Sequence, residues 1–281
     1  MFSITSARGI RALSGLLVFG ATFGAASAQT VRSGAGVDNA AIQATVDQFR
    51  TDLGANNPAN GQHFLTGRRE VNWDGVPDNL SSPNLMPGNF FNAVTPRGIL
   101  FSTPGTGLAV SAKAGNPTNT PVEFGDLDPN YTGMFRAFSP QRLFTAIGSN
   151  IVDVTFAVAG TNEAALTRGF GSVFTDVDLD NSTSIEYFDV NNQSLGKFFA
   201  APGGATNESM SFLGVFWDDA IVSRARVTSG SESLGPGHLT GDIVAMDDFI
   251  YGEPQAVPEP ATMAALGLGA VALIKKKRKP A

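Results

Sequence analysis

The chain has 281 residues, a formal net charge of −6 at pH 7 and no cysteine. Without cysteine it has no disulfide bonds, thiol catalysis or thiolate metal sites, and its two histidines nearly exclude a multi-histidine zinc site. Residues 1–28 and 256–281 together contain seven of the 19 basic residues and one of the 25 acidic residues. Residues 29–255 therefore keep 12 basic and 24 acidic residues. Such a surface repels phosphate backbones, so we expect no nucleic-acid partner.

Residues 1–28 have the order of parts that is typical of a signal peptide. Arg8 and Arg11 precede an apolar stretch, and the small residues Ala26-Ser27-Ala28 follow it. We therefore expect signal peptidase to cut after Ala28 and the rest of the chain to cross the inner membrane. The alternative, a retained membrane helix, is disfavoured because the apolar run is short and a good cleavage site follows it.

Residues 29–60 are predicted to be a helical lead-in segment. Ile42, Val46, Phe49 and Leu53 recur at helical spacing, which predicts an amphipathic helix over residues 38–53. Asp38 can cap its start, and the glycine at position 54 can end it. We expect this helix to pack its apolar stripe on the main domain.

Residues 61–255 are predicted to form an antiparallel β-sandwich or jelly roll. Apolar residues alternate with polar ones at 152–158 and at 221–227, and clusters of Gly, Pro, Asn and Asp separate many short apolar segments. Phenylalanine occurs 21 times, against three tyrosines and two tryptophans. That bias favours a packed core between two sheets over a surface that stacks on sugars.

Three aspartates, Asp176, Asp178 and Asp180, alternate with apolar residues. On a strand they would lie on one face, where like charges repel and a cation would stabilise them. Calcium, which prefers oxygen ligands, is the predicted cofactor. The alternative is a strand that runs out into a solvated acidic loop.

Asp247 and Asp248 are consecutive in an apolar segment. Strand alternation puts one of them on the core face, unless a bulge or a strand end intervenes. A buried carboxylate needs an arginine, a cation or several hydrogen bonds. The first prediction is a structural pairing with Arg224 or Arg226, and calcium is the second.

Trp73 and Asp74 are the candidate ligand-binding residues. Asp74 could offer an oxygen ligand in a loop and Trp73 could stack on a sugar, although a tryptophan is more often a core residue. A glycosidase needs only two carboxylates, and the spacing singles out no pair. No catalytic residue is assigned.

The C-terminal segment, residues 256–281, combines three features. Pro258-Glu259-Pro260 form an extended tripeptide, residues 262–274 are uncharged and mostly apolar, and residues 275–279 are all basic. The apolar run is short for a full span, and the basic cluster keeps its end in the cytoplasm. This order resembles the PEP-CTERM sorting signal of Gram-negative bacteria that make extracellular polysaccharide. The alternative is a plain membrane anchor.

The resemblance implies a partner and a route. Exosortase, a membrane cysteine transpeptidase, would cut the membrane-anchored precursor near residues 258–260 and pass it on to the cell surface or beyond. Residues 169–178 and 246–254 also resemble the uncharacterised β-rich region that often precedes such tails. We therefore predict a non-enzymatic binding or structural module associated with exopolysaccharide. The alternative is a carbohydrate-active hydrolase, which needs a cleft with two facing carboxylates.

Overall fold

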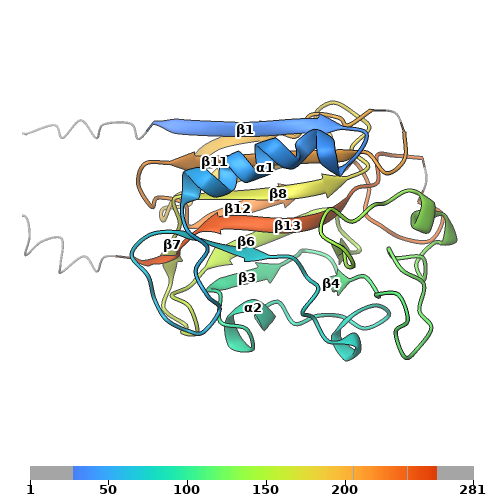
Figure 1. The fold of residues 1–281 in the computed structure, drawn as a ribbon, viewed down its shortest axis with the longest axis horizontal. Coiled ribbons are helices and arrows are strands. Elements are labelled where there is room, and N and C mark those ends of the chain that lie inside the picture. The colour runs from blue at the N-terminus through green and yellow to red at the C-terminus, as the bar shows by residue number, and fades with distance from the viewer. Residues whose placement is uncertain (1–27, 205, 239, 258–281) are drawn as a thin grey trace, which may run out of the picture.

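The computed structural model describes residues 28–204, 206–238 and 240–257. Two antiparallel sheets stack face to face, and one long helix lies on the outer side of the larger sheet (Figure 1). The predicted mainly β, sandwich-like fold is confirmed. The predicted signal peptide, apart from Ala28, and the sorting motif at residues 258–260 lie outside the described residues.

The larger sheet has the order β1-β11-β8-β13-β5-β4, with β2 also paired to β13. The smaller sheet has the order β10-β9-β12-β6-β3, and β14 pairs with β7 beside them. The strands of the larger sheet are β1 (Gln29–Gly36), β2 (Arg68–Val71), β4 (Gly107–Val110), β5 (Phe144–Ile147), β8 (Gly169–Thr175), β11 (Met210–Trp217) and β13 (Ala245–Gly252). Those of the smaller sheet are β3 (Ile99–Ser102), β6 (Ile151–Phe156), β9 (Ser184–Phe188), β10 (Ser194–Phe199) and β12 (Arg224–Thr228). The remaining elements are β7 (Ala165–Leu166), β14 (Gln255–Ala256), the helices α1 (Asn39–Leu53) and α2 (Phe90–Ala93), and the 3-10 helices η1 (Asp78–Leu80) and η2 (Pro129–Gly133).

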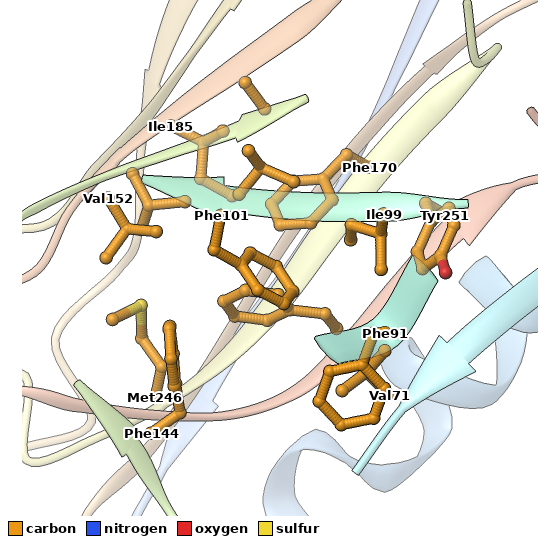
Figure 2. Packing of buried hydrophobic residues seen from close by; sticks show 14 of the residues in the cluster. Val71, Phe91, Ile99, Phe101, Phe144, Val152, Phe170, Ile185, Met246 and Tyr251 are labelled. Carbon is orange, nitrogen blue, oxygen red and sulfur yellow. The ribbon is translucent and has the colours of Figure 1, made fainter. Parts of the chain in front are cut away.

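Aromatic rings fill the space between the sheets. In Figure 2, Phe101 from the smaller sheet and Phe144 and Phe170 from the larger one lie in the same cluster between the sheets. The ring centroids of Phe101 and Phe144 lie 5.5 Å apart, within the range of favourable aromatic contacts. The excess of phenylalanine therefore serves the core, as the composition predicts.

Helix α1 confirms the predicted amphipathic helix. Its four apolar residues are buried, and the Asp38 carboxylate accepts the Ala41 N–H at 3.1 Å. The helix covers β8, β11 and β13, so these strands are buried on both faces and lack alternation. Phe49 lies so close to β11 that a Cβ on Gly214 would be 2.8 Å from its ring.

The segment predicted as a helical lead-in also contains a strand. β1 pairs along its whole length with β11 and forms an edge of the larger sheet (Figure 1). Side chains beside α1 must be small there: a Cβ on Gly34 would be 2.7 Å from the Thr45 hydroxyl. The boundary drawn at residue 60 stays a prediction.

The two ends of the described chain lie at the same end of the sandwich, which we call the tether end (Figure 1). Gln29 and β14 lie there, and the Val257 N–H donates to the Ala164 carbonyl at 3.3 Å. The antiparallel registers place Gly36, Thr175 and Ala245 at the opposite end, the far end. The C-terminal tail therefore begins directly after a strand that is hydrogen-bonded to the sandwich.

Candidate functional site

Asp247 and Asp248 lie at an irregularity in β13, where the register with β8 shifts between Met246 and Phe249. Asp247 is fully buried and accepts the N–H groups of Phe138 and Ser139 at 2.6 and 3.1 Å. Asp248 accepts the Ser139 hydroxyl at 2.6 Å. Burial raises the pKa of both carboxyls above the ordinary value, and their proximity raises that of Asp247 further. The two carboxylates thus hold one loop on the sheet.

The predicted pairing of these aspartates with Arg224 or Arg226 is wrong. Arg224 and Arg226 both bind Asp153 on the smaller sheet, with N–O distances of 2.7 and 2.8 Å. Asp248 is paired instead with Arg50 of α1 at 2.9 Å. The register irregularity places Asp248 beneath the helix, and local sequence patterns give no sign of so distant a partner.

Asp176, Asp178 and Asp180 do not share the face of a strand. β8 ends at Thr175, and Asp176 has φ +69°, the left-handed region. Its carboxylate is buried, and Oδ1 has no hydrogen-bond partner among the described residues. Burial first, and then the charges of Asp178 and Asp242, raise the pKa of Asp176 to about 7.

Asp242 organises the turn after β8, a role that no pattern in the sequence had indicated. The buried Asp242 carboxylate accepts the N–H groups of Asp178 and Leu179 at 3.1 and 3.4 Å, and the Ser182 hydroxyl. In the part of the chain that the structure describes, no three His, Asp or Glu side chains are placed to hold a metal ion. Calcium binding therefore stays a prediction.

Trp73 is a core residue, the more common case for a tryptophan, so its candidate role in stacking on a sugar is wrong. It is 0% exposed, and its ring stacks on Phe144 with centroids 4.0 Å apart. Its indole N–H donates to the Asp247 carbonyl at 3.2 Å. Asp74 accepts the Gln141 N–H at 2.6 Å, and burial raises the pKa of its carboxyl. Both candidate residues therefore have structural contacts: Trp73 packs in the core, and Asp74 binds the backbone of Gln141.

The outward side of the smaller sheet carries mixed polar, charged and aromatic side chains, and we call it the outer face. In one cross-strand row, Phe188, Arg224, Thr155 and Leu100 lie side by side. The Arg224 guanidinium lies 3.7 Å from the centroid of the Phe188 ring. In the next row, Lys197, Glu186, Arg226 and Asp153 alternate in charge. Cross-strand pairs of opposite charge stabilise such a row.

A hollow of about 510 Å³ opens on the outer face at the tether end. Leu100 and Val190 give it apolar walls, while Asn162 and Arg224 contribute polar groups. The Arg224 guanidinium is held in place by Asn192, at 2.5 Å. An apolar concavity of this size with a few fixed polar groups is typical of small-molecule and sugar sites. No pattern in the sequence had singled out this hollow, because its walls come from distant segments.

Comparison with protein families gives one match. Residues 256–279 match the PEP-CTERM protein-sorting motif, a region that starts within β14 and continues into the tail. No curated protein matches the chain. Among the described residues, no helix is long and apolar enough to cross a membrane. The motif indicates export, a C-terminal sorting signal and processing by exosortase.

Proposed function

We propose that this exosortase substrate, exported and sorted by its PEP-CTERM motif, is a non-enzymatic module that binds extracellular polysaccharide on the outer face of its smaller sheet. The hollow at the tether end is the observation that carries the proposal. Sugar rings have apolar faces and hydroxyl edges, so they suit apolar walls with amide and guanidinium groups at the rim.

The polar groups of the hollow are held in fixed positions, which favours binding. Arg224 is fixed by Phe188 beneath it and by Asp153 and Asn192 beside it. A preorganised side chain loses less conformational entropy when a ligand binds. The hollow therefore offers a rigid donor to an acceptor group of the polysaccharide.

The carboxylates support a binding role over hydrolysis. Among the described residues that line the hollow, Asp189 is the one carboxylate. Its Oδ1 accepts the N–H groups of Asn191 and Gln193 at 2.9 and 2.8 Å, so it builds the turn between β9 and β10. A glycosidase requires two carboxyl groups about 5 to 9.5 Å apart across the bond it cuts.

Two matched substitutions test the proposal. Val190 lines the hollow and is 57% exposed, whereas Val94 is 64% exposed and lies outside it. We expect Val190→Asp to weaken binding of the purified full chain to exopolysaccharide from the producing cells by about tenfold, which corresponds to about 1.4 kcal/mol. Val94→Asp should bind like the wild type in the same affinity electrophoresis.

Equal binding by wild type, Val190→Asp and Val94→Asp would refute the hollow as the site. Absence of wild-type binding would refute polysaccharide as the ligand. Release of reducing sugar ends by the wild type would favour the hydrolase alternative.

A further inference from the structure

Besides the branch strand β2, whose Arg68 is hydrogen-bonded to Ala55 and Asn57, the sandwich has four edge strands, and two of them are closed by the same segment. Residues 82–88 run along β4 and β3, the edge strands on one side. The N–H groups of Ser82 and Met86 donate to β4 carbonyls at 2.7 and 2.8 Å, and the Phe101 N–H of β3 donates to the Gly88 carbonyl at 2.9 Å. The backbone groups on these edges are thus partly satisfied within the chain.

The third edge, β10, is protected in another way. Its register with β9 breaks between Ser194 and Gly196, and Gly196 has φ +136°. Lys197 is exposed on the same strand. An irregularity and a lysine are two of the means by which natural edge strands resist pairing with other chains.

The fourth edge, β1, carries none of these protections. Its eight residues form an unbroken antiparallel ladder with β11. It contains no proline, and its one charged residue, Arg32, is engaged by Asp52 of α1 at 2.8 Å. Within the described residues no strand pairs with its other side. Every second residue of β1 therefore presents an N–H and a carbonyl outward.

The side chains of β1 match a second copy of the same strand. In an antiparallel pair, residues directly opposite each other lie on the same face of the sheet. When β1 pairs with a second copy of itself under this condition, two registers pair all but one residue of the strand. One places Arg32 opposite Arg32, where the charges repel. The other places Ser33 opposite Ser33, Arg32 opposite Gly34 and Val31 opposite Ala35. In this register the larger side chains of Arg32 and Val31 each lie opposite a small residue.

The position of α1 is compatible with this pairing. The helix lies above β1 and β11, as Figure 1 shows, and strands are spaced by about 4.8 Å. A two-fold axis normal to the sheet and beside β1 would therefore place the two copies of α1 on the same face of the joined sheet, one on each side of the seam. Ala40, Ala41 and Ala44 are exposed on this helix, so small side chains are available where the helices approach.

We propose that the protein self-associates through β1, which pairs antiparallel with β1 of a second copy so that the two larger sheets become one continuous sheet with Ser33 on the two-fold axis. An interface of this kind is self-complementary and closes after two copies. It buries the outward N–H and carbonyl groups of both strands in hydrogen bonds. This proposal is independent of what the outer face binds.

Because the chain contains no cysteine, single introduced cysteines report on this contact. The antiparallel pairing points the tether ends of the two copies in opposite directions, so we expect Ser33→Cys in the full chain, solubilised in mild detergent, to give a disulfide-linked dimer under mild oxidation. Cα atoms of opposite residues in an antiparallel pair lie 4.5–5.5 Å apart, within disulfide reach. Ser102→Cys, equally exposed on β3, is the control for random collision and should give at least about tenfold less dimer.

Val31→Cys tests the register. In the proposed pairing, Val31 lies opposite Ala35, so the two introduced thiols are separated by about 13 Å along the strands and cannot be bridged. Dimer from Ser33→Cys but from neither of the other variants supports the proposal. Equal dimer from Ser33→Cys and Ser102→Cys, or more from Val31→Cys than from Ser33→Cys, overturns it. An unchanged melting temperature of each variant verifies that the comparison is made on folded protein.

Discussion

Asp176 is a buried carboxyl at the end of β8. Its side chain is 1% exposed and its Oδ1 has no hydrogen-bond partner among the described residues. The pKa of about 7 lies above the ordinary value because of burial and the nearby charges of Asp178 and Asp242. The native state therefore favours the protonated carboxyl, and deprotonation costs stability. This group's contribution is fully present below about pH 4 and is lost as the pH rises through about 7.

Replacing Asp176 with Asn removes this cost with almost no change in shape. Asn also adopts a positive φ readily, so the backbone is not strained by the change. A pKa that moves from about 4 to about 7 corresponds to about 4 kcal/mol, and screening by solvent at the turn reduces this to about 2 kcal/mol. For a domain of this size we expect Asp176→Asn to raise the melting temperature by about 4–8 °C at pH 8.

The assay is thermal unfolding of the full chain in mild detergent and EDTA at pH 8 and pH 4.5. The advantage of Asp176→Asn should shrink towards zero at the lower pH, where the wild-type carboxyl is protonated. Glu123, whose pKa is also raised to about 7 by burial, titrates in both proteins, so the comparison between them isolates Asp176. Asp180→Asn removes the same charge from an exposed position nearby and should change stability by less than about 0.5 kcal/mol.

A destabilised Asp176→Asn at pH 8, or an advantage that persists unchanged at pH 4.5, would refute the reasoning. When the assay is repeated with calcium in place of EDTA, a loss of stability by Asp176→Asn that occurs only with calcium would instead make Asp176 a ligand of the calcium predicted from the sequence. The same measurement thus separates an uncompensated buried carboxyl from a metal ligand.

Two further predictions concern packing and pairing. Gly214→Ala should destabilise the protein by about 1–3 kcal/mol, because the new methyl meets the Phe49 ring at 2.8 Å; Gly133→Ala, which meets no atom within 4 Å, is the matched control in urea unfolding. Glu253→Gln should cost about 3–5 kcal/mol, because it leaves Arg69 buried and charged without its partner at 2.6 Å; substitution of the exposed Glu163 in the same assay should cost less than about 0.5 kcal/mol, and equal losses would contradict the pairing.

Helix α1 could be predicted because its signals are local. The apolar spacing from Ile42 to Leu53 and the capping residue Asp38 lie within one short segment. The neighbouring strand β1 could not be predicted in this way, because its sequence ends in Gly34-Ala35-Gly36, residues with low strand propensity. That strand exists through its pairing with β11, about 180 residues further along the chain. Tertiary pairing here overrides propensity.

At the candidate sites, too, local patterns could be predicted from the sequence and contacts between distant segments could not. From alternation alone, the adjacent aspartates Asp247 and Asp248 indicated one carboxylate on the core face, a bulge or a strand end, and the structure has an irregular register at that position. Their partners, Ser139 and Arg50, could not be inferred, because the contacts join segments about 100 and 200 residues away. Trp73 was a candidate for stacking on a sugar, although a tryptophan is more often a core residue, and the structure buries it in the core.

The central claim is that exosortase sorts this chain through its C-terminal motif, and Glu259 tests it most directly. In cells that make exosortase, the mass of the wild-type protein should correspond to cleavage near residues 258–260, whereas Glu259→Ala should stay at the mass of the uncleaved precursor in the membrane fraction. Glu163→Ala, which removes an exposed acid elsewhere, should mature like the wild type. Normal cleavage and release of Glu259→Ala would contradict the account.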